Sequence, residues 1–194
     1  LNLALRAYSP TSAALALVDY GGETDGDPPQ LAMLYSPPRV PVIIAAYRVY
    51  DWNWGCGADG CRGNPIEWPP VTLLGLGAAT GEPIYLPARR AEMYGGGYVV
   101  MVLYADPTRI TLKYGREDSP ADGYLVHLES FAVDLAIVHR YEEMDRAGRA
   151  ELPALRNGDL LGWATSNEVM VAVRDTGRFM DPRSRKDWWQ GWGE

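Results

Sequence analysis

Short apolar segments separated by Gly, Pro and Asp turns dominate the chain from Val71 onward. The segments are VTLLGLGAA, EPIYLP, YVVMVLYAD, RITLKYG, GYLVHLESF and EVMVAVRD, and most are rich in β-branched or aromatic residues. Strand-length runs at this spacing are typical of an all-β sandwich or barrel. The pattern therefore predicts a mainly β fold for residues 71–194.

Two of these segments carry more specific expectations. In RITLKY the polar side chains of Thr111 and Lys113 alternate with apolar ones. Because successive side chains of a strand point to opposite faces, we expect a half-buried strand whose inner face carries Ile110, Leu112 and Tyr114. YVVMVLY is apolar on both faces, so we expect it near the centre of a sheet.

One helix is expected to interrupt the strands, over residues 134–151 in VDLAIVHRYEEMDRAGRAEL. Asp134 is a good N-cap residue, and Gly148 is expected near the end of the helix. The apolar positions that recur at helical spacing are Leu135, Val138, Tyr141 and Met144.

The first 70 residues differ from the rest because they contain much of the Pro and Gly punctuation, as in GGETDGDPP, SPP and WPP. Between these turns lie two strand-like pieces, LAMLY and VPVIIAAYRVYDW. We therefore expect an N-terminal β and loop extension over residues 1–70, or a long-looped part of the same domain, followed by the main domain over 71–194.

The two cysteines, Cys56 and Cys61, flank a Gly-Ala-Asp-Gly turn. Such a turn can bring their Cα atoms within the roughly 4.4–6.8 Å that a disulfide needs. A two-cysteine zinc site is the alternative, but no second Cys or His pair stands at ligand spacing. The disulfide favours an oxidising, extracellular or cell-envelope location. The chain begins at Leu1, which we interpret as the removal of a leader or another preceding segment.

The net charge of −7 argues against a nucleic-acid partner, which needs a concentrated basic face. No apolar run approaches the roughly 20 residues that span a bilayer, so no membrane span is expected. Arginines do cluster near the C-terminus, but aspartates alternate with them, and a solvated or ion-paired surface is favoured over an anion site. These arginines are Arg174, Arg178, Arg183 and Arg185.

Four stretches, in order, resemble the lysostaphin/LytM-type zinc endopeptidases, which cut peptide bridges in bacterial cell walls. They are GEPIYLP, GYLVHLESF, LRNGDLLGWA and EVMVAVRDTGRFMDP. In the last stretch the matching residues are Arg174, Gly177, Asp181 and Pro182. The resemblance implies a LytM-like antiparallel β sandwich or barrel, with residues 134–151 as an inserted α-helix.

The same resemblance implies that the zinc ligands are missing. Val71, Gly75 and Met170 stand where the family has its three ligands, and Glu168 replaces the preceding histidine. His127 matches the histidine that assists the zinc-bound water, but a catalytic zinc needs three protein ligands. The resemblance therefore implies an inactive pseudoenzyme with no metal or cofactor, and we expect the groove beneath these residues to be filled or free of metal.

Aromatic residues with a polar atom are the remaining candidates for function. The chain has 7 Trp and 12 Tyr against 2 Phe, a bias found at interfaces and sugar-stacking platforms. Core packing would account for many of them. The candidates for binding are Trp52, Trp54, Trp188, Trp189 and Trp192. Because the C-terminal three are costly to leave in water, that tail should dock on its own domain or on a partner.

These observations favour a non-catalytic secreted or cell-surface protein that binds cell-wall glycan or peptide, or an envelope protein. The alternative is a structural subunit of an extracellular filament or multi-subunit assembly, with a possible homo-oligomer. A hydrolase with an unrecognised carboxylate site is a third hypothesis, because the separation of carboxylates in space cannot be deduced from the sequence.

Overall fold

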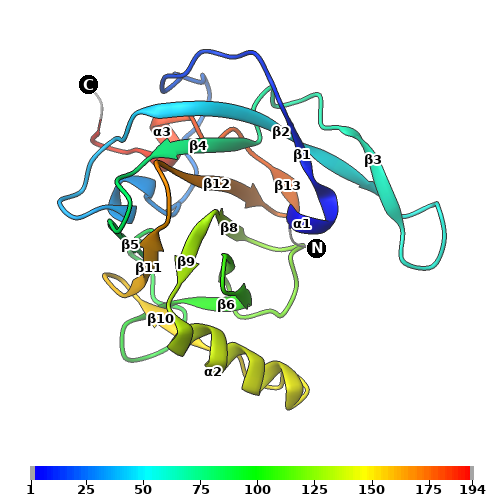
Figure 1. Cartoon of the computed structure of the whole chain (residues 1–194), viewed down its shortest axis with the longest axis vertical. Helices are drawn as coiled ribbons and strands as arrows, with labels where there is room; N and C mark the ends of the chain where they lie inside the picture. The colour runs from blue at the N-terminus through cyan, green and yellow to red at the C-terminus, as the bar shows by residue number, and fades with distance from the viewer. Residues whose placement is uncertain (1–2, 193–194) are drawn as a thin grey trace.

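Antiparallel strands make up most of this fold, as a computed structural model that describes residues 3–192 shows (Figure 1). In order across the 10-stranded sheet, the main path consists of β1 (Tyr8–Pro10), β2 (Ile43–Asn53), β4 (Leu73–Gly77), β12 (Glu168–Asp175), β8 (Tyr124–Glu129), β7 (Arg109–Tyr114), β6 (Tyr98–Asp106) and β10 (Ala154–Arg156). Off this path, β3 (Cys61–Pro65) pairs with β2, and β13 (Arg178–Phe179) pairs with β12.

A second, three-stranded sheet and four short helices complete the fold. The strands are β5 (Pro83–Tyr85), β11 (Leu160–Ala164) and β9 (Phe131–Val133). The helices are α1 (Leu3–Arg6), the 3-10 helix η1 (Leu31–Leu34), α2 (Leu135–Arg146) and α3 (Arg185–Trp188). The mainly β, antiparallel prediction is confirmed, and within residues 3–192 the strands form no closed barrel.

The two faces of the large sheet pack against different surroundings, because successive side chains of a strand alternate. On β12, Val169, Val171 and Val173 enter the main core. Met170 and Ala172 point the other way into a smaller cluster with Leu3, Val49, Leu73 and Phe179. The second face also carries polar residues, and it is the face that matters for the candidate site.

Residues 3–70 are continuous with the rest of the fold. β2 pairs with β4, which places three N-terminal strands, β1, β2 and β3, in the large sheet. Leu31 and Tyr35 lie in the same core as residues after Val71. The strand prediction for LAMLY is wrong: residues Leu31–Leu34 form η1. A short apolar run fits a buried helical turn as well as a strand, and here Leu31, Ala32 and Leu34 are all buried.

The half-buried prediction for RITLKY is wrong. β7 is buried on both faces, since Thr111 is 5% and Lys113 0% exposed. The expectation of a central YVVMVLY is also wrong, because β6 is next to the edge strand β10 while β12 and β8 lie in the middle of the sheet. Helix α2 packs against β6 (Figure 1), which accounts for the burial of a strand so near the edge.

The helix and disulfide predictions are confirmed. The Asp134 side chain accepts a hydrogen bond from the backbone N–H of Ala136 at 2.8 Å and caps α2. The helix ends at Arg146, earlier than expected, and Gly148 follows with φ of 95°. Cys56 and Cys61 are bonded, with Cα atoms 5.9 Å apart, where β2 and β3 are connected. Among the described residues no helix is long and apolar enough to cross a membrane.

Candidate ligand-binding cleft

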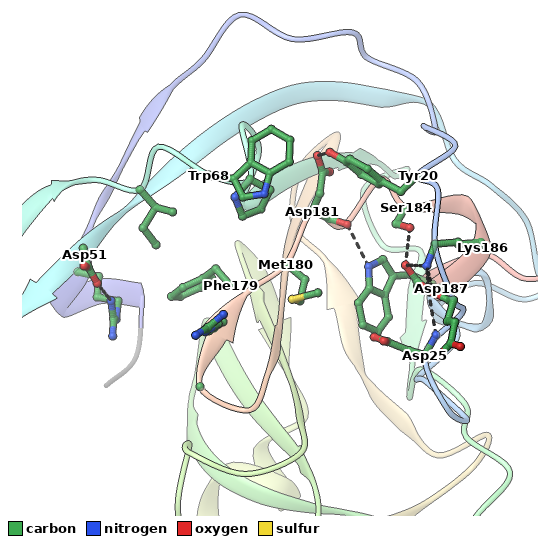
Figure 2. Close-up of a pocket in the computed structure, with 17 residues that line it drawn as sticks. Tyr20, Asp25, Asp51, Trp68, Phe179, Met180, Asp181, Ser184, Lys186 and Asp187 are labelled. Atoms are coloured by element: carbon green, nitrogen blue, oxygen red, sulfur yellow. Dashed lines mark hydrogen bonds and ion pairs between the residues drawn. The ribbon is translucent and has the colours of Figure 1, made fainter.

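A cleft of about 630 Å³ is lined by segments from residues 6–69 and 177–188 (Figure 2). Its walls come from α1, the 20–25 segment, the 66–69 loop after β3, the turn into β13 and the 181–188 segment with α3. The volume lies within the range of about 300–1,000 Å³ that is usual for small-ligand sites.

The middle of the cleft is apolar. Figure 2 shows Trp68 on one side and Phe179 and Met180 on the other. Phe179 is 6% exposed, whereas the Trp68 side chain is 75% exposed. Ile66 and Pro69 extend this surface. An exposed aromatic ring in a cleft offers a flat surface against which a ligand can stack.

One end of the cleft carries carboxylates. Asp187 accepts hydrogen bonds from the Ser184 hydroxyl at 2.6 Å, from Lys186 Nζ at 2.8 Å and from the backbone N–H of Asp25 at 3.1 Å. Burial, together with the charge of Asp187, raises the pKa of Asp25. Asp25 Oδ2 has no hydrogen-bond partner among the described residues. This end can therefore accept hydrogen bonds from an ammonium or a hydroxyl group.

The opposite end carries arginines. Figure 2 places Asp51 at this end, far from Asp25 and Asp187. Arg6 Nη1 lies 3.6 Å from Asp51 Oδ1 and donates to the backbone carbonyl of Tyr50 at 3.3 Å. Arg178 also lines the cleft and is exposed. The cleft thus has Asp25 and Asp187 with Lys186 at one end, Arg6 with Asp51 at the other, and apolar side chains between them.

A buried ion pair fixes the wall formed by the C-terminal segment. Arg183 Nη2 donates to Asp181 Oδ2 at 2.7 Å, and both side chains are at most 5% exposed. The Tyr20 hydroxyl donates to the same oxygen at 2.7 Å. Burial and this hydrogen bond raise the pKa of Tyr20 to about 12. Of the expected solvated or ion-paired surface, the ion pair is found at Arg183, although it is buried and not at the surface. The expectation is wrong for Arg174, which is 5% exposed and forms no ion pair with the described carboxylates.

The residues expected to line a vestigial groove are mostly brought together on the second face of the sheet. Met170 lies opposite Gly75 on β4, and Ala172 lies opposite His127 on β8. A Cβ atom at Gly75 would meet Glu168 Oε1 at 1.8 Å, so any other residue there would require the Glu168 side chain to move. Val71 is different, because it lies in the main core.

The N-terminal segment fills this face. The Tyr8 hydroxyl donates to Met170 Sδ at 3.3 Å, and Leu3 packs in the same cluster as Met170. The Tyr47 hydroxyl donates to Glu168 Oε1 at 3.1 Å. The described residues include no group of three or more His, Cys, Asp or Glu side chains arranged to hold a metal ion.

His127 is held as a neutral imidazole. Its Nδ1 lies 3.0 Å from the Thr111 hydroxyl, and its ring stacks on Phe179 with the centroids 6.1 Å apart. Burial, followed by the charges of Arg174 and Arg6, lowers the pKa of His127 well below its usual value. The side chain is 2% exposed and is therefore not available to bulk water.

We expect acid to destabilise the protein through His127. Below about pH 6.5 the unfolded chain protonates this residue and the folded chain does not, so the free energy of unfolding attributable to it should fall by about 1.4 kcal/mol per pH unit. Urea unfolding at a series of pH values should show this slope reduced in His127→Gln. The control variant His139→Gln, on the exposed side of α2, keeps the buried imidazole and should keep the slope. An unchanged slope in His127→Gln would contradict the expectation.

The tryptophan candidates fall into two groups. Trp188 and Trp189 are fully buried in their own domain, and Trp192 packs against the same core. Their indole N–H groups explain part of this docking, since Trp188 donates to the Asp181 carbonyl at 3.0 Å and Trp189 to the Pro182 carbonyl at 2.8 Å. The two buried indoles are thus core residues, and Trp188 also belongs to the lining of the cleft.

The other two tryptophans lie on the β2–β3 hairpin. Trp52 and Trp54 pack edge to face with ring centroids 6.3 Å apart, and Trp54 is 66% exposed. They do not line the cleft. The cleft is lined by Trp68, Asp25 and Asp187, which were not predicted from the sequence. The only local signal was the WPP turn, since the cleft assembles segments more than 100 residues apart in the sequence.

Comparisons with protein-family models, with curated proteins and with solved structures gave no match for this chain.

Proposed function

We propose that this chain is a non-catalytic binding protein whose cleft holds a short peptide with both a positive and a negative group. The observation that carries the proposal is the polarity of the cleft, with Asp25 and Asp187 at one end, Arg6 beside the exposed Asp51 at the other and the exposed Trp68 ring between them. An extended peptide has matching chemistry, because its ammonium and carboxylate groups are separated by apolar and amide surface.

The residues that line the cleft favour a binding role over hydrolysis. They include none of the chain's two histidines and two cysteines, and the cysteines are bonded to each other. Ser184 lines the cleft, but its hydroxyl donates to Asp187 instead of to a histidine base. Asp25, with its raised pKa beside Asp187, is the one feature that favours a carboxylate-based hydrolase, so hydrolysis is included in the test.

We further propose that the protein is secreted or exposed at the cell surface, with the peptide part of the cell wall as its ligand. The disulfide supports an oxidising compartment. The ordered motifs that resemble LytM-type endopeptidases support a degenerate peptidase-like scaffold and a ligand of that chemical kind.

A second candidate function, as a structural subunit, is favoured by the exposed aromatic hairpin. Trp54 is 66% exposed, and β3 pairs with β2 beyond the main path of the sheet. If this hairpin mediates assembly, sedimentation should show a concentration-dependent oligomer that Trp54→Ala dissociates.

Calorimetric titration with short alanine-rich peptides that have free termini tests the main proposal. We expect saturable binding and an unchanged peptide after incubation. Release of peptide fragments would favour the hydrolase, and binding of cell-wall glycan without any binding of peptide would overturn the peptide proposal.

The Trp68→Ala variant should bind the same peptides at least tenfold more weakly. A tenfold loss corresponds to about 1.4 kcal/mol, which is within the range of an aromatic binding residue. Because Trp68 is 75% exposed, the substitution should leave the unfolding midpoint nearly unchanged. Trp163→Ala is the matched control, since Trp163 is 41% exposed on β11 and lies outside the cleft. Equal affinities of Trp68→Ala and Trp163→Ala for the peptides would show that Trp68 does not contribute to binding.

A further inference from the structure

Buried nitrogen atoms without hydrogen-bond partners gather around Phe179. In the part of the chain that the structure describes, 7 buried side-chain nitrogen or oxygen atoms have no partner. The nitrogens Arg6 Nε, His127 Nε2, Arg174 Nε and Arg174 Nη1 are four of them. They belong to three side chains, each of which contacts the Phe179 ring. We call Arg6, His127, Arg174 and Phe179 the Phe179 cluster.

The cluster joins three parts of the fold. The guanidinium carbon of Arg174, on β12, lies 5.0 Å from the Phe179 ring centroid, and that of Arg6, on α1, lies 5.3 Å away. His127, on β8, stacks on the same ring with an interplanar angle of 22°. The three polar side chains are each at most 6% exposed, so these nitrogens have little contact with bulk water.

The cluster is rich in donors and lacks acceptors. Arg174 Nη2 donates to the Gly177 carbonyl at 2.8 Å, and no carboxylate in the described chain forms an ion pair with Arg174. His127 Nδ1 lies 3.0 Å from the Thr111 hydroxyl, and in the tautomer in which Nδ1 accepts this hydrogen bond, the proton is on Nε2 and makes that nitrogen a donor too. The carboxylate of Asp51 pairs with Arg6 at 3.6 Å, and its side chain is 72% exposed.

The charge of the cluster is not balanced. Burial, followed by the charge of Arg6, lowers the pKa of Arg174 to about 10, which still leaves the guanidinium positive at neutral pH. An unpaired buried charge and unsatisfied buried donors both destabilise a fold. A bound group that supplies negative charge and several acceptor oxygens would relieve both effects.

We propose that the Phe179 cluster binds an oxyanion through Arg6, Arg174 and His127. The anion is either the carboxylate of a ligand in the cleft or a free phosphate, since both present acceptor oxygens to guanidinium groups. Arg6 and Phe179 themselves line the end of the cleft opposite Asp25, whereas Arg174 and His127 contact the Phe179 ring and do not line the cleft. The carboxylate alternative rests on the proposed function, whereas the phosphate alternative does not.

Thermal unfolding with inorganic phosphate, at constant ionic strength, tests the site directly. The wild-type midpoint should rise saturably with phosphate, and Arg174→Met should not respond. Because methionine replaces an unpaired buried charge with an apolar side chain of similar length, this variant should fold with an equal or higher midpoint in the absence of anion. Arg140→Met is the matched control, with an exposed arginine on α2, and should respond like the wild type. A phosphate response in Arg174→Met equal to that of the wild type would overturn the proposal.

Titration of the short peptides with a free or an amidated C-terminus separates the two sources of the anion. If the peptide carboxylate is the ligand, the wild type should bind the amidated peptide at least tenfold more weakly than the free-acid peptide. Arg174→Met should bind the two peptides with equal affinity. Equal binding of both forms, with no phosphate response, overturns the anion site and leaves the peptide cleft standing. Phosphate stabilisation without any peptide binding supports the anion site and overturns the proposed function.

An NMR titration of the wild-type protein with phosphate tests the site even if Arg174→Met does not fold. The His127 imidazole and the arginine Nε–H resonances should shift with phosphate. His139, the other histidine of the chain, should not shift. Shifts of the same size at both histidines would count as non-specific binding and against the site.

Discussion

Replacing Trp188 by alanine should lower the free energy of unfolding by about 3–5 kcal/mol, as expected for the removal of a large aromatic side chain from a core. Trp188 is fully buried, packs edge to face on Tyr124 with ring centroids 5.8 Å apart, and donates its indole N–H to the Asp181 carbonyl. The substitution removes all three interactions and leaves a cavity under the cleft wall. Urea denaturation monitored by circular dichroism measures the effect.

Trp54→Ala is the matched control for this prediction. Trp54 is 66% exposed on the hairpin, so its loss should change the free energy of unfolding by no more than about 0.5 kcal/mol. Similar effects of the two substitutions would mean that the C-terminal segment does not dock as described. Removal of the tail tryptophans is accordingly a test of folding and not of assembly, which is why the assembly test above uses Trp54.

The second large effect is expected at the buried ion pair. Asp181→Ala should destabilise the protein by about 3–5 kcal/mol, because it leaves Arg183 as a buried charge without its carboxylate. The carboxylate also accepts from the backbone N–H of Arg183 at 3.0 Å and from the Tyr20 hydroxyl at 2.7 Å. The measurement is again equilibrium unfolding in urea.

The double variant Asp181→Ala/Arg183→Met separates the pair from the packing around it. It should be more stable than Asp181→Ala alone, since it no longer buries an unpaired charge. Asp19→Ala is a control on an exposed pair: Arg185 Nε lies 2.9 Å from Asp19, whose side chain is 78% exposed. That change should cost no more than about 1 kcal/mol. A cost as large as that of Asp181→Ala would show that burial does not determine the strength of these pairs.

Local patterns in the sequence predicted the features that local physics determines. Asp134 was identified as an N-cap, and it caps α2. The turn between Cys56 and Cys61 brings the two residues close enough to bond. The strands β4, β6, β7, β8 and β12 all fall within segments that the alternation of apolar residues and turns had marked. Each of these features depends on residues near one another in the chain.

The failures share a different cause. Lys113 is a polar residue on an alternating strand, and alternation alone places it in water; in the fold its Nζ donates to the Asp122 carbonyl and the side chain is fully buried. Arg174 stands among aspartates in the sequence, but none of the described carboxylates pairs with it, because it lies on the face of β12 that meets Arg6 and Phe179. Which segments cover these two side chains is decided by tertiary packing, and for Arg174 that packing brings in Arg6 from the other end of the sequence.

The sequence by itself determined that the chain is mainly β, where its long helix begins, and that its cysteines pair, because hydrophobic alternation, capping and short turns act between neighbouring residues. Only the tertiary structure decided which charges are buried, where the tail tryptophans dock and what forms the cleft. Asp25 and Trp68 line the same cleft as Asp187, which follows both by more than 100 residues, and Arg6 contacts Phe179 although the two are also more than 100 residues apart. Such contacts depend on how the sheet pairs and on which segments cover its faces, and no local pattern contains that information.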